Sequence, residues 1–249
     1  MTEGSIPILE TREVSKRFGG VQALDSVSMK VHAGEVVALA GDNGAGKSTL
    51  IKTISGVHQP DQGEIFLNGK PIRFETPHQA RDRGIETIYQ DLALADNLSI
   101  GANIFLGREP MRKAFRFLPV LDRARMAEAA RETMARLEFH VTRLDAPVSA
   151  FSGGQRQAVA IGRALYWDAQ LMIMDEPTAA LGVPEQRKVI ALIKALKVQG
   201  RGVIFISHNL GDIFAVADRI VVLRRGVLAG ERRVSQTSPD EIVRLMVGG

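Results

Sequence analysis

Nine consecutive residues have the types and spacing of a phosphate-binding loop. The first eight fit the pattern G-x-x-x-x-G-K-[ST] and read Gly41-Asp42-Asn43-Gly44-Ala45-Gly46-Lys47-Ser48, and Thr49 follows them. In such a loop the glycines let backbone N–H groups turn toward phosphate oxygens, the lysine neutralises the outer phosphate charge, and the serine hydroxyl can ligate Mg²⁺. We therefore predict that residues 41–49 bind a nucleoside triphosphate. Because no Asn-Lys-x-Asp motif of the guanine-reading kind occurs, we expect ATP rather than GTP.

Two carboxylates follow a second apolar run. Asp175 and Glu176 come directly after Leu171–Met174, and ligands bind at the carboxyl ends of strands in open parallel sheets. We predict that Asp175 belongs to the Mg²⁺ shell. Glu176 is predicted to orient or deprotonate a water for in-line attack on the γ-phosphate.

The elements that must position these residues indicate an α/β protein. Unbroken apolar runs at Val36–Ala40, Leu171–Met174 and Val203–Ile206 are typical of parallel strands buried on both faces. Residues 13–31 and 64–74 alternate like antiparallel strands, with an Asn-Gly turn signal at 68–69. In residues 91–167 the strand signal disappears, and we predict an inserted helical subdomain. One of its helices is expected to start after an Asp122 N-cap and to run to about residue 139. A last short helix is predicted after residue 238.

A third motif precedes another helical pattern. Phe151 is followed by Ser152-Gly153-Gly154-Gln155. Ser-x-x-Gln is itself a capping box, and a serine hydroxyl with bare amides at a helix N-terminus also makes an anion site. With the loop at 41–49, the carboxylates, Gln90 and His208 in this order, the chain resembles the nucleotide-binding subunit of ATP-binding cassette (ABC) proteins over nearly its whole length.

This resemblance implies a fold and a set of roles. The fold is a P-loop NTPase (RecA-like) core with a parallel sheet, an N-terminal antiparallel β subdomain and an inserted α-helical subdomain. One domain spans residues 1–249, with 1–90 and 168–249 as the catalytic core and 91–167 as the helical subdomain. Phe18 would stack on adenine, Gln90 would contact Mg²⁺ and water, and His208 would contact the γ-phosphate. Residues 152–155 would close over ATP bound by a second copy, so a homodimer is implied.

Two positions depart from the family pattern. Phe151 stands where leucine is usual, which is a tolerable apolar exchange. Residues 179–182 read Ala-Ala-Leu-Gly where the family has Ser/Ala-x-Leu-Asp, so Gly182 replaces an aspartate. This puts in doubt how strongly the two sites of a dimer communicate, although Glu176 is retained and ATPase activity is expected.

The segment after Gln90 suggests a branch of the family. Residues 90–100 and 103–109 look like the coupling region of bacterial monosaccharide importers of the ribose, xylose and fructose type. The resemblance implies two transmembrane permease subunits as partners and an extracytoplasmic sugar-binding protein as an indirect one. We expect a peripheral protein on the cytoplasmic face of the bacterial inner membrane, with no nucleic-acid partner. An importer of another solute and a soluble ABC ATPase acting on nucleic acid stay as alternatives.

Composition and charge exclude some kinds of site and some classes of protein. The 249 residues include no cysteine, which excludes disulfides and thiolate metal sites. No apolar run approaches the roughly 18–20 residues of a membrane helix, and the N-terminus has no secretory signal pattern. The net charge is +4, and residues 108–125 alone hold six basic and two acidic residues. Such a cluster can be a solvated surface, or it can contact nucleic acid or an anionic leaflet.

Overall fold

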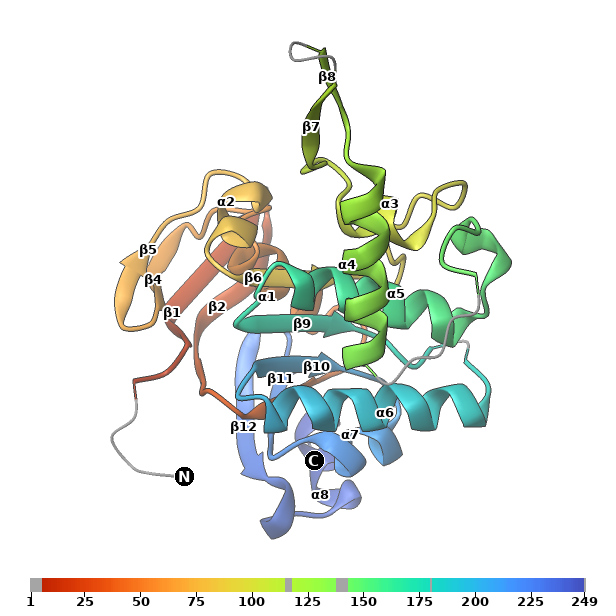
Figure 1. The fold of residues 1–249 in the computed structure, drawn as a ribbon. Coiled ribbons are helices and arrows are strands. Elements are labelled where there is room, and N and C mark those ends of the chain that lie inside the picture. The colour runs from red at the N-terminus through yellow and green to blue at the C-terminus, as the bar shows by residue number, and fades with distance from the viewer. Residues whose placement is uncertain (1–5, 115–117, 138–142, 180, 249) are drawn as a thin grey trace.

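The computed structural model describes residues 6–114, 118–137, 143–179 and 181–248 (Figure 1). Within these ranges the strands are β1 (Leu9–Phe18), β2 (Val21–Val31), β3 (Val36–Ala40), β4 (Gln62–Leu67), β5 (Lys70–Ile72), β6 (Ile85–Ile88), β7 (Met111–Ala114), β8 (Leu118–Leu121), β9 (Leu171–Asp175), β10 (Gly202–Ile206), β11 (Arg219–Arg224) and β12 (Val227–Arg233). The helices are α1 (Lys47–Ile54), α2 (Pro77–Asp82), α3 (Ile100–Ile104), α4 (Arg123–Arg136), α5 (Gly153–Tyr166), α6 (Val183–Val198), α7 (Leu210–Val216) and α8 (Pro239–Val247).

The larger sheet has the strand order β12-β11-β3-β10-β9-β6. All its neighbours pair in parallel except the β11–β12 hairpin, which is antiparallel. The three apolar runs of the sequence are the three strands β3, β10 and β9 at its centre. Every residue of β3 and of β10 is buried, because layers of the protein cover both faces of the sheet. The predicted parallel sheet is confirmed.

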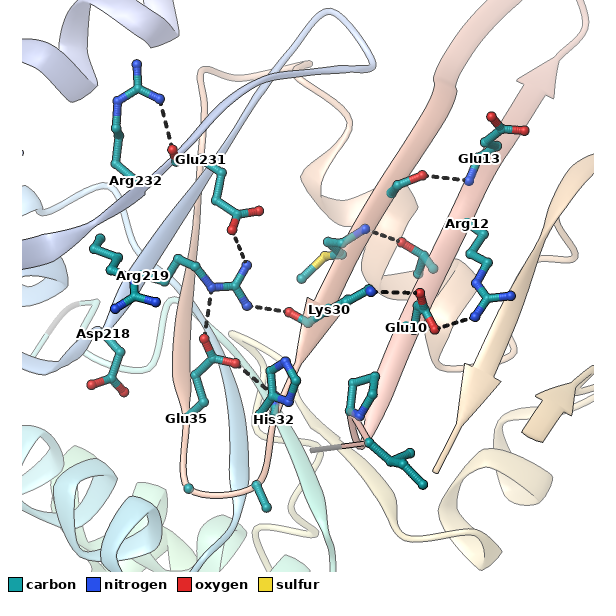
Figure 2. Close-up of a pocket in the computed structure, with 18 of the residues that line it drawn as sticks. Glu10, Arg12, Glu13, Lys30, His32, Glu35, Asp218, Arg219, Glu231 and Arg232 are labelled. Carbon is teal, nitrogen blue, oxygen red and sulfur yellow. Dashed lines mark hydrogen bonds and ion pairs between the residues drawn. The ribbon is translucent and has the colours of Figure 1, made fainter. Parts of the chain in front are cut away.

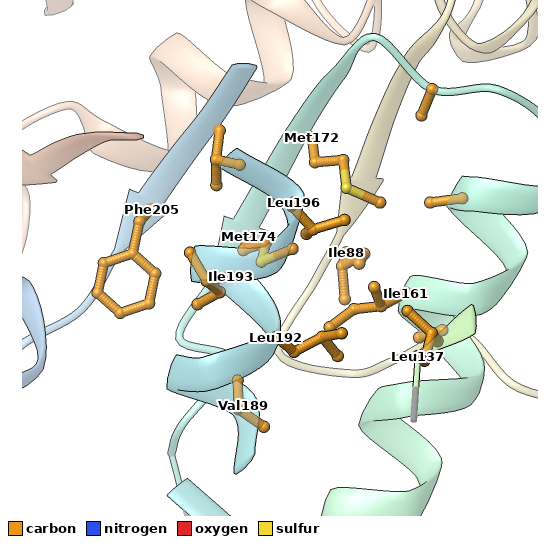
Figure 3. Close-up of a cluster of buried hydrophobic side chains, with 14 of the residues drawn as sticks. Ile88, Leu137, Ile161, Met172, Met174, Val189, Leu192, Ile193, Leu196 and Phe205 are labelled. Atoms are coloured by element: carbon orange, nitrogen blue, oxygen red, sulfur yellow. The ribbon is translucent and has the colours of Figure 1, made fainter. Parts of the chain in front are cut away.

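Alternate residues of each central strand face two different cores. Val36 and Ala38 pack with α4, α5, α6 and α7, whereas Val37 and Leu39 pack with α1 and the smaller sheet. Figure 3 shows the first core, where Leu192 of α6 lies among apolar side chains of the sheet and of α5. Because successive side chains of a strand point to opposite faces, the sheet packs against the helical layer on one face and against α1 on the other.

The smaller sheet is antiparallel, with the order β2-β1-β4-β5. Asn68 and Gly69 form the β4–β5 turn with positive φ values of 50° and 75°, a backbone conformation that this residue pair favours. The predicted N-terminal β subdomain is confirmed.

The predicted helical subdomain contains α3, α4 and α5, and their N-caps follow sequence signals. Asp122 accepts a hydrogen bond from the Arg125 N–H at 3.1 Å, as predicted. Helix α4 ends at Arg136, and residues 138–142, where we placed the helix end, lie outside the described residues. Trp167 follows α5 and donates its indole N–H to the Ile104 carbonyl at 2.9 Å, which joins α5 to α3.

The prediction that residues 91–167 lack strands is wrong. Strands β7 and β8 pair antiparallel with each other and with no other described strand. Each has four residues and neither alternates cleanly between apolar and polar side chains, so no strand period was there to detect. Figure 1 shows the pair standing out from the helical layer, at the top of the view.

The closing helix α8 is confirmed, with Ser238 accepting from the Glu241 N–H at 3.3 Å. Helix α1 begins at Lys47, within the phosphate-loop pattern. Among the described residues no helix is long and apolar enough to cross a membrane.

Candidate active site

Four neighbouring parallel strands end at one edge of the larger sheet and bring distant parts of the chain together. Strand β3 leads into the phosphate loop, β10 into Ser207 and His208, and β9 ends at Asp175. Strand β6 ends two residues before Gln90. The register pairs Ile206 with Asp175 and Ile88 with Met174, so these strand ends lie level with one another.

The loop between β3 and α1 requires glycine at two positions. Gly41 and Gly46 have φ values of 148° and 104°, which L side chains rarely adopt. A Cβ added to Gly41 would lie 2.3 Å from the Leu223 carbonyl oxygen, and one added to Gly46 would lie 2.7 Å from that of Ala23. Backbone therefore packs directly against the loop on both sides and fixes its shape.

Lys47 lies inside this loop. Its Nζ donates hydrogen bonds to the carbonyl oxygens of Gly41 at 2.6 Å and Asp42 at 3.0 Å. Burial lowers the pKa of Lys47, and the nearby carboxylates of Glu176 and Asp175 oppose that shift. Helix α1 starts at this point without a side-chain cap, so its first N–H groups can bind an anion.

Asp175 and Glu176 differ in backbone geometry but share an environment. Burial raises the pKa of both carboxyl groups above the ordinary range. Glu176 has a φ of 52°, uncommon for a residue with a side chain and costing about 1–3 kcal/mol. Its N–H donates to the Ile206 carbonyl oxygen at 3.0 Å, and this bond to β10 holds the residue in place.

His208 meets Glu176 across the edge of the sheet. Its Nε2 lies 3.1 Å from Glu176 Oε1, and its backbone N–H donates to Glu176 Oε2 at 3.4 Å. The imidazole is half exposed whereas the carboxylate is mostly buried. The structure thus places the imidazole of His208 beside the predicted base.

Phe18 lies at the end of β1 with an exposed ring. The ring is in edge-to-face contact with His58, with centroids 5.0 Å apart, and Lys16 Nζ lies 5.5 Å from its centroid. An aromatic side chain that is 43% exposed at a strand end has a face free to stack on a planar base. Sequence reasoning did not identify His58, because no spacing rule links it to Phe18.

The Ser152–Gln155 motif is not joined to the phosphate loop within one chain. Both halves of the capping box are formed at the start of α5: the Ser152 N–H donates to Gln155 Oε1 at 2.9 Å, and the Gln155 N–H donates to Ser152 Oγ at 3.4 Å. A Cβ on Gly154 would lie 3.0 Å from Glu185 of α6. In the described part of the chain no hydrogen bond or ion pair connects this motif with residues 41–49.

Gly182, which replaces the family's aspartate, is the N-cap of α6. A Cβ at this position would lie 2.9 Å from Glu185 Oε2. A carboxylate is therefore present beside residue 182, supplied from three residues further along. Residue 180 lies outside the described residues.

Sequence reasoning also missed the residues that shape the segment after Gln90. Asn103 is fully buried, and its amide bonds to Ala95 N, Ala95 O, Leu98 O and Ser99 O at 2.7–3.2 Å. Arg163 of α5 donates to the carbonyl oxygens of Ala93 at 3.0 Å and Leu92 at 3.5 Å. Residues 92–99 are thus attached to α3 and α5. The one sequence signal for these contacts was Asn103, a polar residue inside an apolar helix pattern.

A wide pocket elsewhere in the protein contains none of the predicted site residues. It has a volume of about 1580 Å³ and lies between β1, β2 and the β11–β12 hairpin (Figure 2). Its charges neutralise one another: Arg219 pairs with Glu35 and with Glu231, both at 2.8 Å, and Glu10 pairs with Arg12 at 2.8 Å. We therefore place the candidate site at the strand ends.

A family model described as "ABC transporter" matches residues 24–179, a span that contains the phosphate loop, both carboxylates and the Ser152 motif. The chain belongs to the ABC transporter family. The resemblance drawn from the motifs is confirmed.

Named relatives of this ABC protein are import ATP-binding proteins. It is 50% identical to the xylose/arabinose import ATP-binding protein of Sulfolobus acidocaldarius, covering 96% of this chain and 93% of that one. It is 48% identical to the fructose import ATP-binding protein of Rhizobium meliloti, covering 94% and 90%. With a ribose import ATP-binding protein of Streptomyces coelicolor it shares 45% identity, and there it spans 98% of its own length and 48% of the relative's.

Solved ABC cassettes share the fold. The ADP conformation of the ATP-binding cassette MJ1267 superposes with a TM-score of 0.83 at 27% identity, covering 98% of this chain and all of that one. A nucleotide-free cassette from an ABC transporter gives a TM-score of 0.81 at 27% identity, with 98% and 96% covered. The predicted fold class is confirmed.

Proposed function

We propose that this ABC protein is the ATP-binding and ATP-hydrolysing subunit of a monosaccharide importer. One observation carries the chemistry: the strand ends bring the Lys47 loop, the two carboxylates and His208 to one edge of the sheet. The substrate class follows from relatives that are 50% and 48% identical over most of the chain and are named for xylose/arabinose and fructose import.

Each of these residues has a different role in phosphoryl transfer to water. Loop N–H groups and Lys47 hold the phosphates, where they stabilise the charge that develops on the γ-phosphoryl group. Glu176 accepts a proton from the attacking water, and its raised pKa brings the carboxylate nearer to the working range of a general base. His208 lies close enough to Glu176 to hold that carboxylate in place and to contact the γ-phosphate.

The oxygen-rich edge also suits Mg²⁺. Asp175, the Ser48 hydroxyl and Gln90 are hard oxygen donors of the kind this ion prefers. When bound, the ion would neutralise phosphate charge.

A homodimer completes the site. Within one chain Ser152 is fixed at the start of α5 and makes no described contact with the loop, so a second copy has to supply this helix N-terminus to the ATP phosphates. Its hydroxyl and amides would add donors and exclude water around the nucleotide.

The partners follow from the same proposal. Two permease subunits contact the segment 90–109, and a sugar-loaded extracytoplasmic binding protein acts on the permeases rather than on this chain. The protein is then peripheral on the cytoplasmic face of the membrane, and it does not bind nucleic acid.

The decisive experiment is an ATPase assay in lipid vesicles that contain the candidate permease pair. We expect turnover to rise when a sugar-loaded binding protein is added and to fall by about 10²–10⁴-fold in Glu176→Gln, the usual contribution of a general base. Turnover that responds to DNA or RNA and ignores the permeases would contradict the importer and favour the nucleic-acid alternative.

A further inference from the structure

The antiparallel pair β7–β8 and the first turn of α4 form one projection, which we call the basic hairpin. It consists of Met111–Ala114, Leu118–Leu121 and Arg123–Arg125. The two strands pair only with each other among the described strands, and Figure 1 shows them extending away from the rest of the fold. A two-stranded sheet without a covering layer is marginally stable in water.

Large apolar side chains are exposed on this hairpin. Met111 is 55% exposed, Leu118 is 62% exposed and Leu121 is 41% exposed. The register places Met111 opposite Leu121, so these two side chains share one face of the pair, whereas Leu118, three residues before Leu121, lies on the other face. Side chains of this size gathered on a projection indicate contact with another body.

The charges beside them are one-sided. The side chains of Arg112, Lys113, Arg123 and Arg125 make no ion pair with any described residue. The two acidic residues of the region are occupied by backbone, since Glu109 accepts from the Gly107 N–H at 3.0 Å and Asp122 accepts from the Arg125 N–H at 3.1 Å.

The start of α4 adds two cations to the basic hairpin. This helix has 14 residues, its first and third residues are Arg123 and Arg125, and its first turn holds no acidic residue. The positive end of the helix dipole disfavours cations, and the Asp122 carboxylate at the N-cap offsets this effect in part.

We propose that the basic hairpin docks on the anionic headgroups of the membrane surface, with Met111 and Leu121, which share one face of the pair, entering the boundary of the acyl chains. Arginine and lysine beside exposed apolar groups are the composition of interfacial membrane-binding segments. The cytoplasmic loops of membrane proteins carry excess lysine and arginine, so the lipid is a better match for these cations than the permease. The hairpin begins two residues after Glu109, where the segment proposed to contact the permeases ends. Its expected place near the membrane surface therefore rests on the proposed function.

The test is cosedimentation of the full-length protein with vesicles. We expect binding to phosphatidylglycerol/phosphatidylcholine vesicles that weakens at high salt, and little binding to phosphatidylcholine alone. The double variant Arg112→Gln/Lys113→Gln should lower the partition coefficient by roughly 30-fold, since each cation near an anionic surface contributes about fivefold. Met111→Ser/Leu121→Ser should also weaken binding, but without changing its dependence on salt.

Arg187→Gln/Lys194→Gln is the matched control. It removes the same charge from exposed positions on α6 and should leave vesicle binding unchanged. All three variants should keep the ATP affinity of the wild type, so loss of the hairpin's role is distinguishable from failure of the proposed ATPase. Equal loss in the control, or no preference for anionic vesicles, would overturn the proposal. So would binding of a DNA or RNA duplex that is tighter than vesicle binding at the same salt and lost in Arg112→Gln/Lys113→Gln.

Discussion

Glu176 combines features that work against stability and in favour of chemistry. Its backbone has a φ of 52°, its carboxylate is mostly buried beside Asp175, and burial raises its pKa. If Glu176 had only a structural role, a relaxed backbone and an exposed carboxylate would make the protein more stable. The coincidence of the observed features at one position is typical of a group retained for reaction.

This has a measurable consequence for stability. Because the folded pKa is raised above the ordinary 4.5, the folded state binds the proton more tightly than the unfolded one. The contribution of Glu176 to stability therefore falls as pH rises from 4.5 through the folded pKa. Glu176→Gln has no such loss, so its stability relative to wild type should increase with pH. Urea unfolding near pH 4.5 and near neutral pH checks this, and a stability gain that shrinks with pH would contradict it.

Phe18 gives a second prediction at this scale. Stacking of a base on an aromatic ring contributes about 1–3 kcal/mol, and it is equal in ground and transition states. Phe18→Ala should therefore raise the KM for ATP by roughly 5- to 150-fold and leave kcat nearly unchanged. Phe18→Tyr keeps the ring and is the control. A fall in kcat with KM unchanged would remove Phe18 from the base-binding role.

The motifs located Lys47, Asp175 and the Ser152 cap because each depends on local spacing. They could not predict that His58 contacts Phe18. Nor could they predict that Glu185 lies beside Gly182 and Gly154, because packing alone brings these segments together. Nor did they indicate the positive φ of Glu176, which is set by its hydrogen bond to β10.

At the scale of elements, the N-terminus of α5 has two separable roles. Ser152 caps the helix, and it is proposed to bind phosphate on a second copy. Ser152→Ala should lower the free energy of unfolding by about 1 kcal/mol and weaken ATP-dependent dimer formation. Ser152→Asp keeps a good cap but places a carboxylate against phosphate, so it should retain stability and still lose the dimer. Thermal melts and size-exclusion chromatography with ATP test both, and a dimer that survives in Ser152→Asp would argue against the phosphate contact.

The elements differ in how far the sequence predicts them. Strands β3, β9 and β10 are continuous apolar runs because both faces of the sheet are covered, and the sequence predicts them well. Strands β7 and β8 have no core to face, so no burial period marks them. Helix α1 begins inside the phosphate-loop pattern, because Lys47, Ser48 and Thr49 belong to both the loop and the helix.

At the scale of the whole molecule, two copies and ATP should form one unit. We expect Glu176→Gln to bind ATP without hydrolysing it, so this variant should shift from monomer to dimer on addition of ATP and Mg²⁺. Sizing by light scattering measures the shift. Lys47→Ala should stay monomeric under the same conditions because it loses phosphate binding. A Glu176→Gln protein that remains monomeric at saturating ATP would contradict the shared site.

The contact between Trp167 and Ile104 gives this molecule a built-in optical probe. Trp167 is the one tryptophan in the sequence, its indole N–H bonds to the end of α3, and Arg108 lies 4.9 Å from its ring. Tryptophan emission from the unlabelled protein therefore originates in the helical layer, where α3 and α5 meet. A rotation of that layer that changes the surroundings of Trp167 should therefore change the wavelength and intensity of its emission, which can be recorded during turnover.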